Sequence, residues 1–242
     1  MGIEFDASDS VSLWFGMPES ASPIDPEADD RARSLASALL DIEAVSLRPH
    51  DPFTWSSGLR APIYCDNRRT LAHPSVRRAI ADGFADVVQR RAWAPLTIAG
   101  TATAGIPHAA WLADRLDAPM AYVRSEAKGH GQGRRIEGAR LGTSDEVVVV
   151  EDLVSTGGSA LDAVSAVRET GATVRAVLAI FSYGLAAAEE AFRDAKVACH
   201  VLTTFPVLLD VARREHGLSD LDWALLKEWR SDPEAWSRQH EG

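Results

Sequence analysis

Short apolar runs alternate with longer amphipathic segments from about residue 73 onward. Runs rich in Val, Ile, Leu and Ala between turn residues are typical of buried parallel strands, and the segments between them are typical of helices. We predict strands at 96–100, 120–124, 147–150, 173–181 and 197–203. We predict helices at 74–90, 106–116, 159–170 and 189–195. This alternation implies β-α-β units, so the predicted fold class is α/β with a doubly wound, mostly parallel sheet.

The first part of the chain lacks this alternation. Residues 1–28 are acidic and rich in Ser and Pro, so we expect a poorly ordered extension, with Trp14 and Phe15 as candidates for docking on the body. A helix is predicted at 29–42, where apolar residues recur on one face. The stretch at about 44–72 begins with Pro- and aromatic-rich sequence too irregular to assign, and we expect a small hood there.

The last part of the chain is predicted to be a helical tail. It covers about 220–238, is interrupted near Pro233 and carries three tryptophans. A length of 242 residues suits one domain with a substantial core. Residues 29–242 are therefore expected to form one domain that includes the hood and this tail.

Composition excludes several classes of protein. The formal net charge of −10 argues against a general binder of nucleic acid or anionic membranes, because those partners favour basic surfaces. No apolar run approaches the length of a membrane span, and the first residues lack the basic start of a signal peptide. Cys65 and Cys199 belong to no C-x-x-C pair. We therefore expect a cytoplasmic protein. Because the chain is acidic overall, a local cluster of Lys and Arg residues would mark a candidate site for an anionic ligand.

The valine run at 147–150 leads into the stretch with the clearest chemistry. It is followed by Glu151, Asp152, Leu153, Val154, Ser155, Thr156, Gly157, Gly158 and Ser159. Adjacent carboxylates at a strand end accept hydrogen bonds from a sugar diol, and a Ser/Thr/Gly turn at a helix N-terminus binds phosphate. A purely local role in turn formation and helix capping is the alternative. The absence of an apolar anchor in the turn favours a phosphorylated ribose as the ligand.

Two further stretches suit a phosphate-bearing ligand, and the first of them, together with the turn at 155–159, suits a ligand with phosphates at both ends. The first is the small-residue turn Gly100, Thr101, Ala102, Thr103, Ala104 and Gly105, whose amides can approach a diphosphate closely; tight strand–helix packing is the alternative. The second is the Gly-rich loop at 125–142, where Lys and Arg cluster in an acidic chain. A mobile cationic loop that covers a leaving diphosphate competes here with a plain solvated loop. No P-loop, zinc or hydrolase motif is present.

The acidic stretch resembles the phosphoribosyl-pyrophosphate signature of the type I phosphoribosyltransferases. Two other segments narrow the resemblance to the orotate phosphoribosyltransferases: Tyr-Val-Arg-Ser-Glu-Ala-Lys-Gly-His-Gly from Tyr122, and Ser-Gly-x-x-x-Pro-Ile-Tyr-Cys-Asp-Asn-Arg from Ser57. The resemblance covers roughly 35–205. It implies the type I phosphoribosyltransferase fold, transfer of phosphoribose to orotate, Mg²⁺ bound mainly through phosphoribosyl pyrophosphate, and a homodimer with shared active sites.

The resemblance also implies roles for particular residues. Arg124, Lys128 and His130 would contact the diphosphate, and with Asp152 they are the expected catalytic residues. Tyr64 would lie against the orotate ring. The other expected substrate contacts, which include both carboxylates, are Glu151, Asp152, Leu153, Val154, Ser155, Thr156, Gly157, Gly158, Ser159, Thr101, Ala102, Thr103, Ala104 and Gly105.

This chain departs from many relatives at three lysine positions, where it carries Ser56, Ala104 and Ser125. Arg60 is a candidate for compensation. Two alternatives remain open. A phosphoribosyltransferase for a purine or uracil would share the ribose-binding residues. A regulator that senses phosphoribosyl pyrophosphate and binds DNA would be expected to carry a basic helical module, which an acidic chain without a helix-turn-helix pattern does not offer.

Overall fold

The computed structural model describes residues 14–15, 26–55, 57–93, 96–125 and 135–240. These residues form a seven-stranded sheet in the order β1-β11-β10-β9-β6-β7-β8. Its strands are β1 (Trp14–Phe15), β6 (Thr97–Thr101), β7 (Met120–Val123), β8 (Ile136–Gly138), β9 (Glu146–Val154), β10 (Thr173–Ser182) and β11 (Ala198–Thr204). The five central strands pair in parallel, and the short edge strands β1 and β8 pair antiparallel. The predicted mostly parallel sheet is confirmed.

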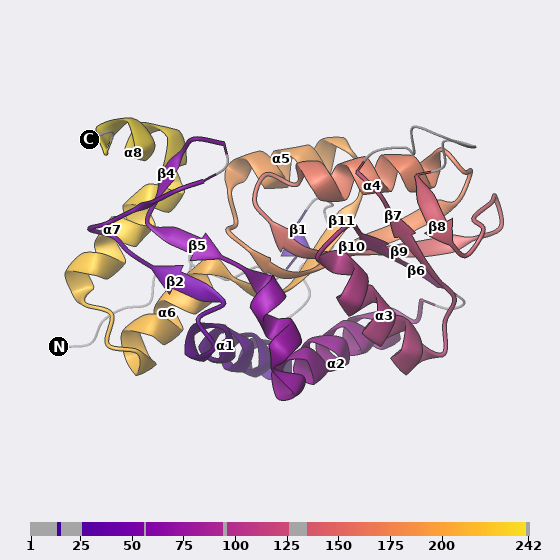
Figure 1. The fold of residues 1–242 in the computed structure, drawn as a ribbon, viewed down its shortest axis with the longest axis horizontal. Helices are drawn as coiled ribbons and strands as arrows, with labels where there is room; N and C mark the ends of the chain where they lie inside the picture. Colours follow the sequence, from indigo (N-terminus) through magenta and orange to yellow (C-terminus); the bar gives the residue numbers. More distant parts are fainter. Residues whose placement is uncertain (1–13, 16–25, 56, 94–95, 126–134, 241–242) are drawn as a thin grey trace.

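Helices cover both faces of this sheet (Figure 1). One face carries α1 (Pro26–Asp41), α2 (Pro74–Arg90) and α3 (Gly105–Leu116), and the other carries α4 (Gly158–Arg168) and α5 (Ala186–Asp194). Period-two side chains of the strands divide between two cores. Val148 and Val150 of β9 belong to the cluster of α1–α3, whereas Val147 and Val149 belong to that of α4 and α5. Continuous apolar strands are therefore required by burial on both faces.

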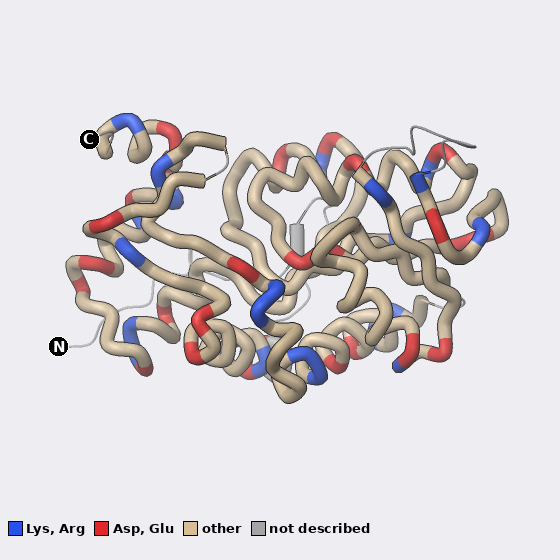
Figure 2. Tube along the Cα trace, in the orientation of Figure 1, with Lys and Arg blue, Asp and Glu red and all other residues tan. Residues whose placement is uncertain are grey.

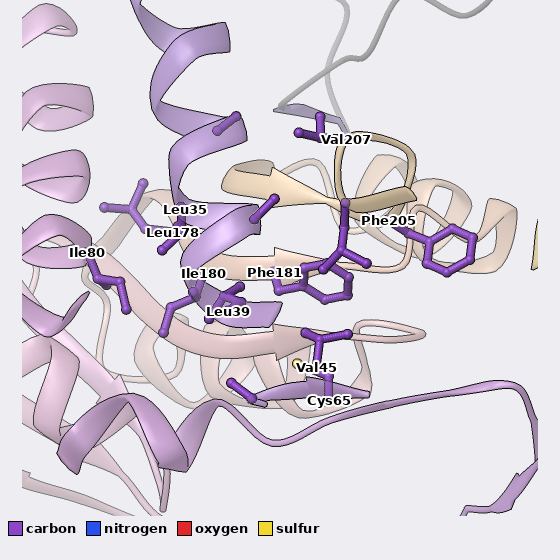
Figure 3. Packing of buried hydrophobic residues seen from close by; sticks show 14 of the residues in the cluster. Leu35, Leu39, Val45, Cys65, Ile80, Leu178, Ile180, Phe181, Phe205 and Val207 are labelled. Atoms are coloured by element: carbon purple, nitrogen blue, oxygen red, sulfur yellow. The ribbon is translucent and has the colours of Figure 1, made fainter. Parts of the chain in front are cut away.

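The larger core also contains part of the hood. Figure 3 shows Leu178 and Ile180 of β10 packed near Leu35 and Leu39 of α1, with Cys65 of the hood in the same cluster. The hood consists of two small antiparallel pairs and a 3-10 helix. Its elements are β2 (Val45–Leu47) with β5 (Ile63–Cys65), β3 (Phe53–Thr54) with β4 (Arg60–Ala61), and η2 (Asn67–Ala72). It is thus anchored to the sheet by shared apolar burial.

The chain ends in three helices: α6 (Phe205–Glu215), α7 (Asp220–Ser231) and α8 (Pro233–Gln239). The last two occupy the residues where the helical tail was predicted, with a break before Pro233, and they lie beside the hood (Figure 1). Helix α6 was not predicted. It follows β11 without a loop, with a proline in its first turn, so the sequence lacks a turn signal between the two elements.

Other boundaries also differ from the prediction. Helix α1 begins at Pro26, ahead of the predicted start at residue 29. Strand β9 continues to Val154 instead of ending at Val150, because its backbone keeps pairing with β10 as far as Ser182. Strand β1, within the expected extension, pairs with β11.

Charge is distributed evenly over the described chain. Figure 2 shows acidic and basic positions mixed over the helices and loops. Among the described residues, no helix is long and apolar enough to cross a membrane.

Candidate active site

The small-residue turn after β6 and the acidic, Gly-rich turn after β9 lie at neighbouring strand ends, at the point where the order of the strands reverses. The chain runs from β6 to β7 on one side, and from β9 to β10 and β11 on the other. Helix α3 after β6 packs on one face, and α4 after β9 packs on the opposite face. In open α/β sheets, ligands bind in the crevice at this switch point, outside the carboxyl ends of the strands.

The acidic end of β9 has a strand partner on one side only. Pairing with β6 ends at Gly100 opposite Val150, whereas pairing with β10 continues to Val154. Glu151 and Asp152 therefore lie on a strand that is held by its ladder to β10 and has lost its neighbour on the β6 side. This geometry holds the two carboxylates rigidly at the crevice.

Glu151 is buried, with 5% of its surface exposed. Its Oε1 accepts hydrogen bonds from Thr101 Oγ1 at 2.8 Å and from the Asp152 N–H at 2.9 Å, while Oε2 is buried without a partner. Desolvation, reinforced by the adjacent Asp152, raises the pKa of Glu151 to about 8. Desolvation also raises the pKa of Asp152. The pair is poorly satisfied as two anions, so hydroxyl donors or a cation from a ligand would stabilise it.

Asn67 of the hood reaches the same pair. It is almost fully buried, and its Nδ2 donates to the Asp152 carbonyl oxygen at 2.6 Å. Its neighbour Asp66 pairs with Arg68, whose guanidinium holds the pKa of that carboxyl below its usual range. Asn67 belongs to a segment that carries the family resemblance, but no periodicity or motif links it to a strand 85 residues away, so the sequence alone gives it no role.

The turn after β9 has the features of an anion site. Gly157 has φ +86° and forms the N-cap of α4, and no side chain caps the helix there. A Cβ at Gly157 would lie 2.7 Å from Phe192 Cε2, so both conformation and space require glycine. A hollow of about 140 Å³ is lined by Leu153, Ser155, Thr156, Gly157, Gly158, Ser159 and Ala160. The first amides of α4 are oriented to bind a phosphate in such a hollow.

The turn after β6 combines packing with access. A Cβ at Gly105 would lie 2.4 Å from the Val150 carbonyl oxygen, so this glycine is required by close packing against β9. Thr101 is buried, and its hydroxyl is directed to Glu151. Thr103 is exposed and Ala104 is partly exposed. The local packing explanation therefore accounts for the glycine, while the middle of the turn stays accessible to a ligand.

The described part of the cationic loop begins at the end of β7. Arg124 Nη1 lies 3.4 Å from Glu137 Oε1, and the Arg124 N–H donates to the Arg135 carbonyl oxygen at 2.8 Å. Lys128 and His130 lie outside the described residues. Arg124 thus stands at a strand end of the same sheet edge, with about a third of its side chain exposed.

Tyr64 is the exposed aromatic of the hood, with 42% of its surface accessible. The pKa of Arg68 is raised chiefly by Asp66, with smaller electrostatic contributions from Tyr64 and Asp152. The Tyr64 hydroxyl and Asp152 are therefore within electrostatic range of the same guanidinium. Arg60, the candidate for compensation, is engaged within the hood, where its Nη1 donates to Thr54 Oγ1 at 3.1 Å.

Two of the three positions at which many relatives carry lysine are among the described residues, and they differ in exposure. Ser125 is exposed and Ala104 half-buried, and Ser56 lies outside the described residues. No group of three or more His, Cys, Asp or Glu side chains that could hold a metal ion occurs within the described ranges. The protein oxygens at the crevice that fit a cation are those of Glu151 and Asp152, since both carboxyls have raised pKa values and Glu151 Oε2 has no partner.

An acid pair at the switch point, flanked by two small-residue turns, is the arrangement expected of a protein that handles a phosphorylated sugar. A sequence profile for the phosphoribosyl transferase domain matches residues 68–206, more than half of the chain. The chain therefore belongs to the phosphoribosyltransferases.

Its relatives narrow the family further. The orotate phosphoribosyltransferase of Halalkalibacterium halodurans is 51% identical over 208 residues, which span 86% of this chain and 99% of the relative. That of Cutibacterium acnes is 53% identical over 209 residues, spanning 86% and 96%. The crystal structure of orotate phosphoribosyltransferase from Aeropyrum pernix matches with a TM-score of 0.64 at 35% identity, over 73% of this chain and 96% of that one. Within its family the chain is an orotate phosphoribosyltransferase, and the resemblance found in the sequence is confirmed.

Proposed function

We propose that the protein transfers 5-phosphoribose from phosphoribosyl pyrophosphate to orotate, giving orotidine 5′-monophosphate and diphosphate for pyrimidine synthesis. One observation carries this function: the buried Glu151 and the half-buried Asp152 at the sheet switch point are followed directly by an uncapped, glycine-dependent helix N-terminus. The spacing fits a ribose whose hydroxyls meet the carboxylates and whose 5′-phosphate meets the turn at 155–159.

The carboxylates have two tasks in this proposal. They accept hydrogen bonds from the ribose 2′- and 3′-hydroxyls, which satisfies the orphaned Oε2 of Glu151. They also favour the oxocarbenium-like state that forms as the bond from the anomeric carbon to diphosphate breaks. The raised pKa values show that two negative charges are unfavourable here without a ligand. A positively charged sugar beside the two acids would stabilise their ionised forms, so the attraction is strongest in the transition state.

The leaving diphosphate and the entering base occupy opposite sides of the sugar. Arg124, Lys128 and His130 would neutralise the departing diphosphate, together with the backbone of 101–105. Tyr64 would lie against the orotate ring. Orotate enters as an anion, so the site does not demand a strong general base.

A magnesium ion would be held mainly by the diphosphate and ribose oxygens, since Mg²⁺ prefers phosphate oxygens and water to a full protein cage. Glu151 and Asp152 are the protein carboxylates that would face it. When bound, the ion supplies charge neutralisation of the diphosphate. We also expect a homodimer in which the loop at 125–142 reaches the partner's site, and a cytoplasmic location.

Base preference is the direct test of this function. Purified protein with Mg²⁺ and phosphoribosyl pyrophosphate is supplied in turn with orotate, uracil, adenine or guanine, and the nucleotide products are separated by chromatography. We expect orotidine 5′-monophosphate as the main product. Turnover of a purine or uracil without orotate turnover would refute the assignment of the base, while leaving the ribose-binding proposal intact.

A further inference from the structure

The Trp-bearing tail links the hood to the catalytic sheet. Helices α7 and α8 follow the region matched by the family profile, which ends at residue 206, and Figure 1 shows them beside the hood. From α8, the Ser237 hydroxyl accepts a hydrogen bond from the Arg60 N–H of β4 at 2.9 Å, and Ser237 is buried. From α7, Arg230 Nε donates to the Gly184 carbonyl oxygen at 3.2 Å, just beyond β10. The tail therefore contacts both the hood and the segment that follows β10 of the sheet.

Trp229 occupies the centre of this link and is fully buried. Its ring packs edge-on against three aromatic rings from different parts of the chain. The ring centroids lie 5.7 Å from Trp55 of the hood, 5.7 Å from Tyr183 after β10 and 5.4 Å from Phe205 of α6. Removal of the tail contacts would leave the hood with less buried surface to fix its distance from the sheet.

The hood side of the link leads to the proposed base contact. Trp55 Nε1 donates to the Ile63 carbonyl oxygen at 3.0 Å, and Ile63 precedes Tyr64 on β5. The body side leads to a rigid support, because the Tyr183 N–H donates to the Val154 carbonyl oxygen at 3.2 Å. The central sheet contains no residue of the tail, so its strand pairing does not depend on the tail. The hood strands have only two or three residues each and rely on packing against other elements. A disturbed tail should therefore displace the β3, β4 and β5 part of the hood, which carries Tyr64. Asn67 of η2, held by its own bond to Asp152, and the turns after β6 and β9 should stay in place.

We propose that Trp229, Arg230 and Ser237 are positioning residues, which hold the hood and its Tyr64 against the sheet edge and so set the affinity of the enzyme for the base. This inference rests on the proposed function, in which Tyr64 contacts orotate. It assigns the tail a role in base binding although the tail touches neither carboxylate nor either anion turn in the contacts described above.

The test measures steady-state kinetics of Ser237→Ala and Arg230→Ala with each substrate varied in turn. Each variant removes one hydrogen bond at one end of the link, so we expect the KM for orotate to rise about three- to tenfold. The KM for phosphoribosyl pyrophosphate should stay within about twofold of wild type. The matched control is Arg238→Ala, which lies on α8 next to Ser237. The exposed guanidinium of Arg238 lies 4.0 Å from Glu234, and the KM values of this variant should not change.

A merely structural role makes different predictions. If the variants melt at a lower temperature but keep the wild-type KM for orotate, or if both KM values rise equally, the inference is wrong. Ser237→Thr retains the hydroxyl and should restore the KM for orotate; failure to do so also counts against it. Arg230→Lys serves as a milder second variant if Arg230→Ala does not fold. Wild-type turnover of orotate is measured first, so failure of the proposed function is seen separately, and the same comparison then uses whichever base is turned over.

Discussion

Replacement of Glu151 by glutamine should stabilise the unliganded protein at alkaline pH and remove most of its activity. The carboxyl is buried, its Oε1 has two donors, and its Oε2 has none. A glutamine keeps the acceptor and places an amide donor where the wild type has an unpartnered oxygen beside Asp152. The substitution thus removes a buried charge without creating a cavity.

The magnitude follows from the pKa of Glu151, which burial raises from 4.5 to about 8. Because the folded state holds this proton more tightly than the unfolded state, the stabilisation is complete below about pH 4.5 and is lost as the pH rises through 8. At about 1.4 kcal/mol per pH unit, wild-type protein should lose about 3 kcal/mol between pH 6 and pH 9 through this group. Glu151→Gln should not show this loss.

Urea unfolding at pH 6 and pH 9 measures the difference between the two proteins. The control is Glu146→Gln at the start of the same strand, where pairing with exposed Arg175 lowers the pKa of the carboxyl, so the alkaline loss should persist. Equal pH dependence in wild type and Glu151→Gln would refute the reasoning. In the same preparation kcat/KM for phosphoribosyl pyrophosphate should fall about a hundredfold, because a glutamine cannot supply the negative charge that Glu151 carries in the transition state once its proton is lost.

Three other substitutions test separate parts of the site. Lys128→Ala should lower turnover at least about tenfold with an unchanged melting temperature, and unchanged turnover would remove the loop from the mechanism. Asn67→Ala should raise the KM for phosphoribosyl pyrophosphate about fivefold, through loss of the bond to the Asp152 carbonyl, in initial-rate assays; an unaltered KM would refute this. Gly157→Ala should cost about 2 kcal/mol in urea unfolding, since φ is +86° and the Cβ meets a buried ring, whereas Gly158→Ala has open space and should be near neutral; equal costs would contradict the account.

The acidic end of β9 illustrates what the sequence predicts well. A valine run, two acids and a small-residue turn are consecutive, so the chemistry can be located without knowledge of any distant contact. The strand boundary was wrong for a related reason. Polar residues interrupt the apolar pattern at Glu151, but the backbone continues to pair because Leu153 and Val154 have partners on β10. Ladder pairing is a tertiary property and overrides the local pattern.

The hood and tail show the opposite case. Their positions depend on contacts between residues that are far apart in sequence, such as Arg60 with Ser237, 177 positions apart. Short strands with mixed apolar and polar patterns give little local signal. The sequence therefore predicts where in the chain the hood lies but not which of its residues form strands. The Trp residues of the tail were visible in the sequence. Their packing against Trp55 and Tyr183 was not, because any buried aromatic is compatible with many partners.

The same feature explains both the cost and the use of the acid pair. Where the pairing of β9 with β6 has ended, Glu151 has no strand partner on that side but keeps the apolar surroundings of β9, so its charge is desolvated and only half satisfied. An empty site is then destabilised as the carboxyls ionise, and a bound sugar or cation offsets that penalty. Pairing with β10 holds this strand in place, so the two acids cannot move into solvent when they ionise. Their charge is instead stabilised by a positively charged sugar bound beside them. The rigidity of the parallel sheet is thus what makes a destabilising pair of carboxylates effective in catalysis.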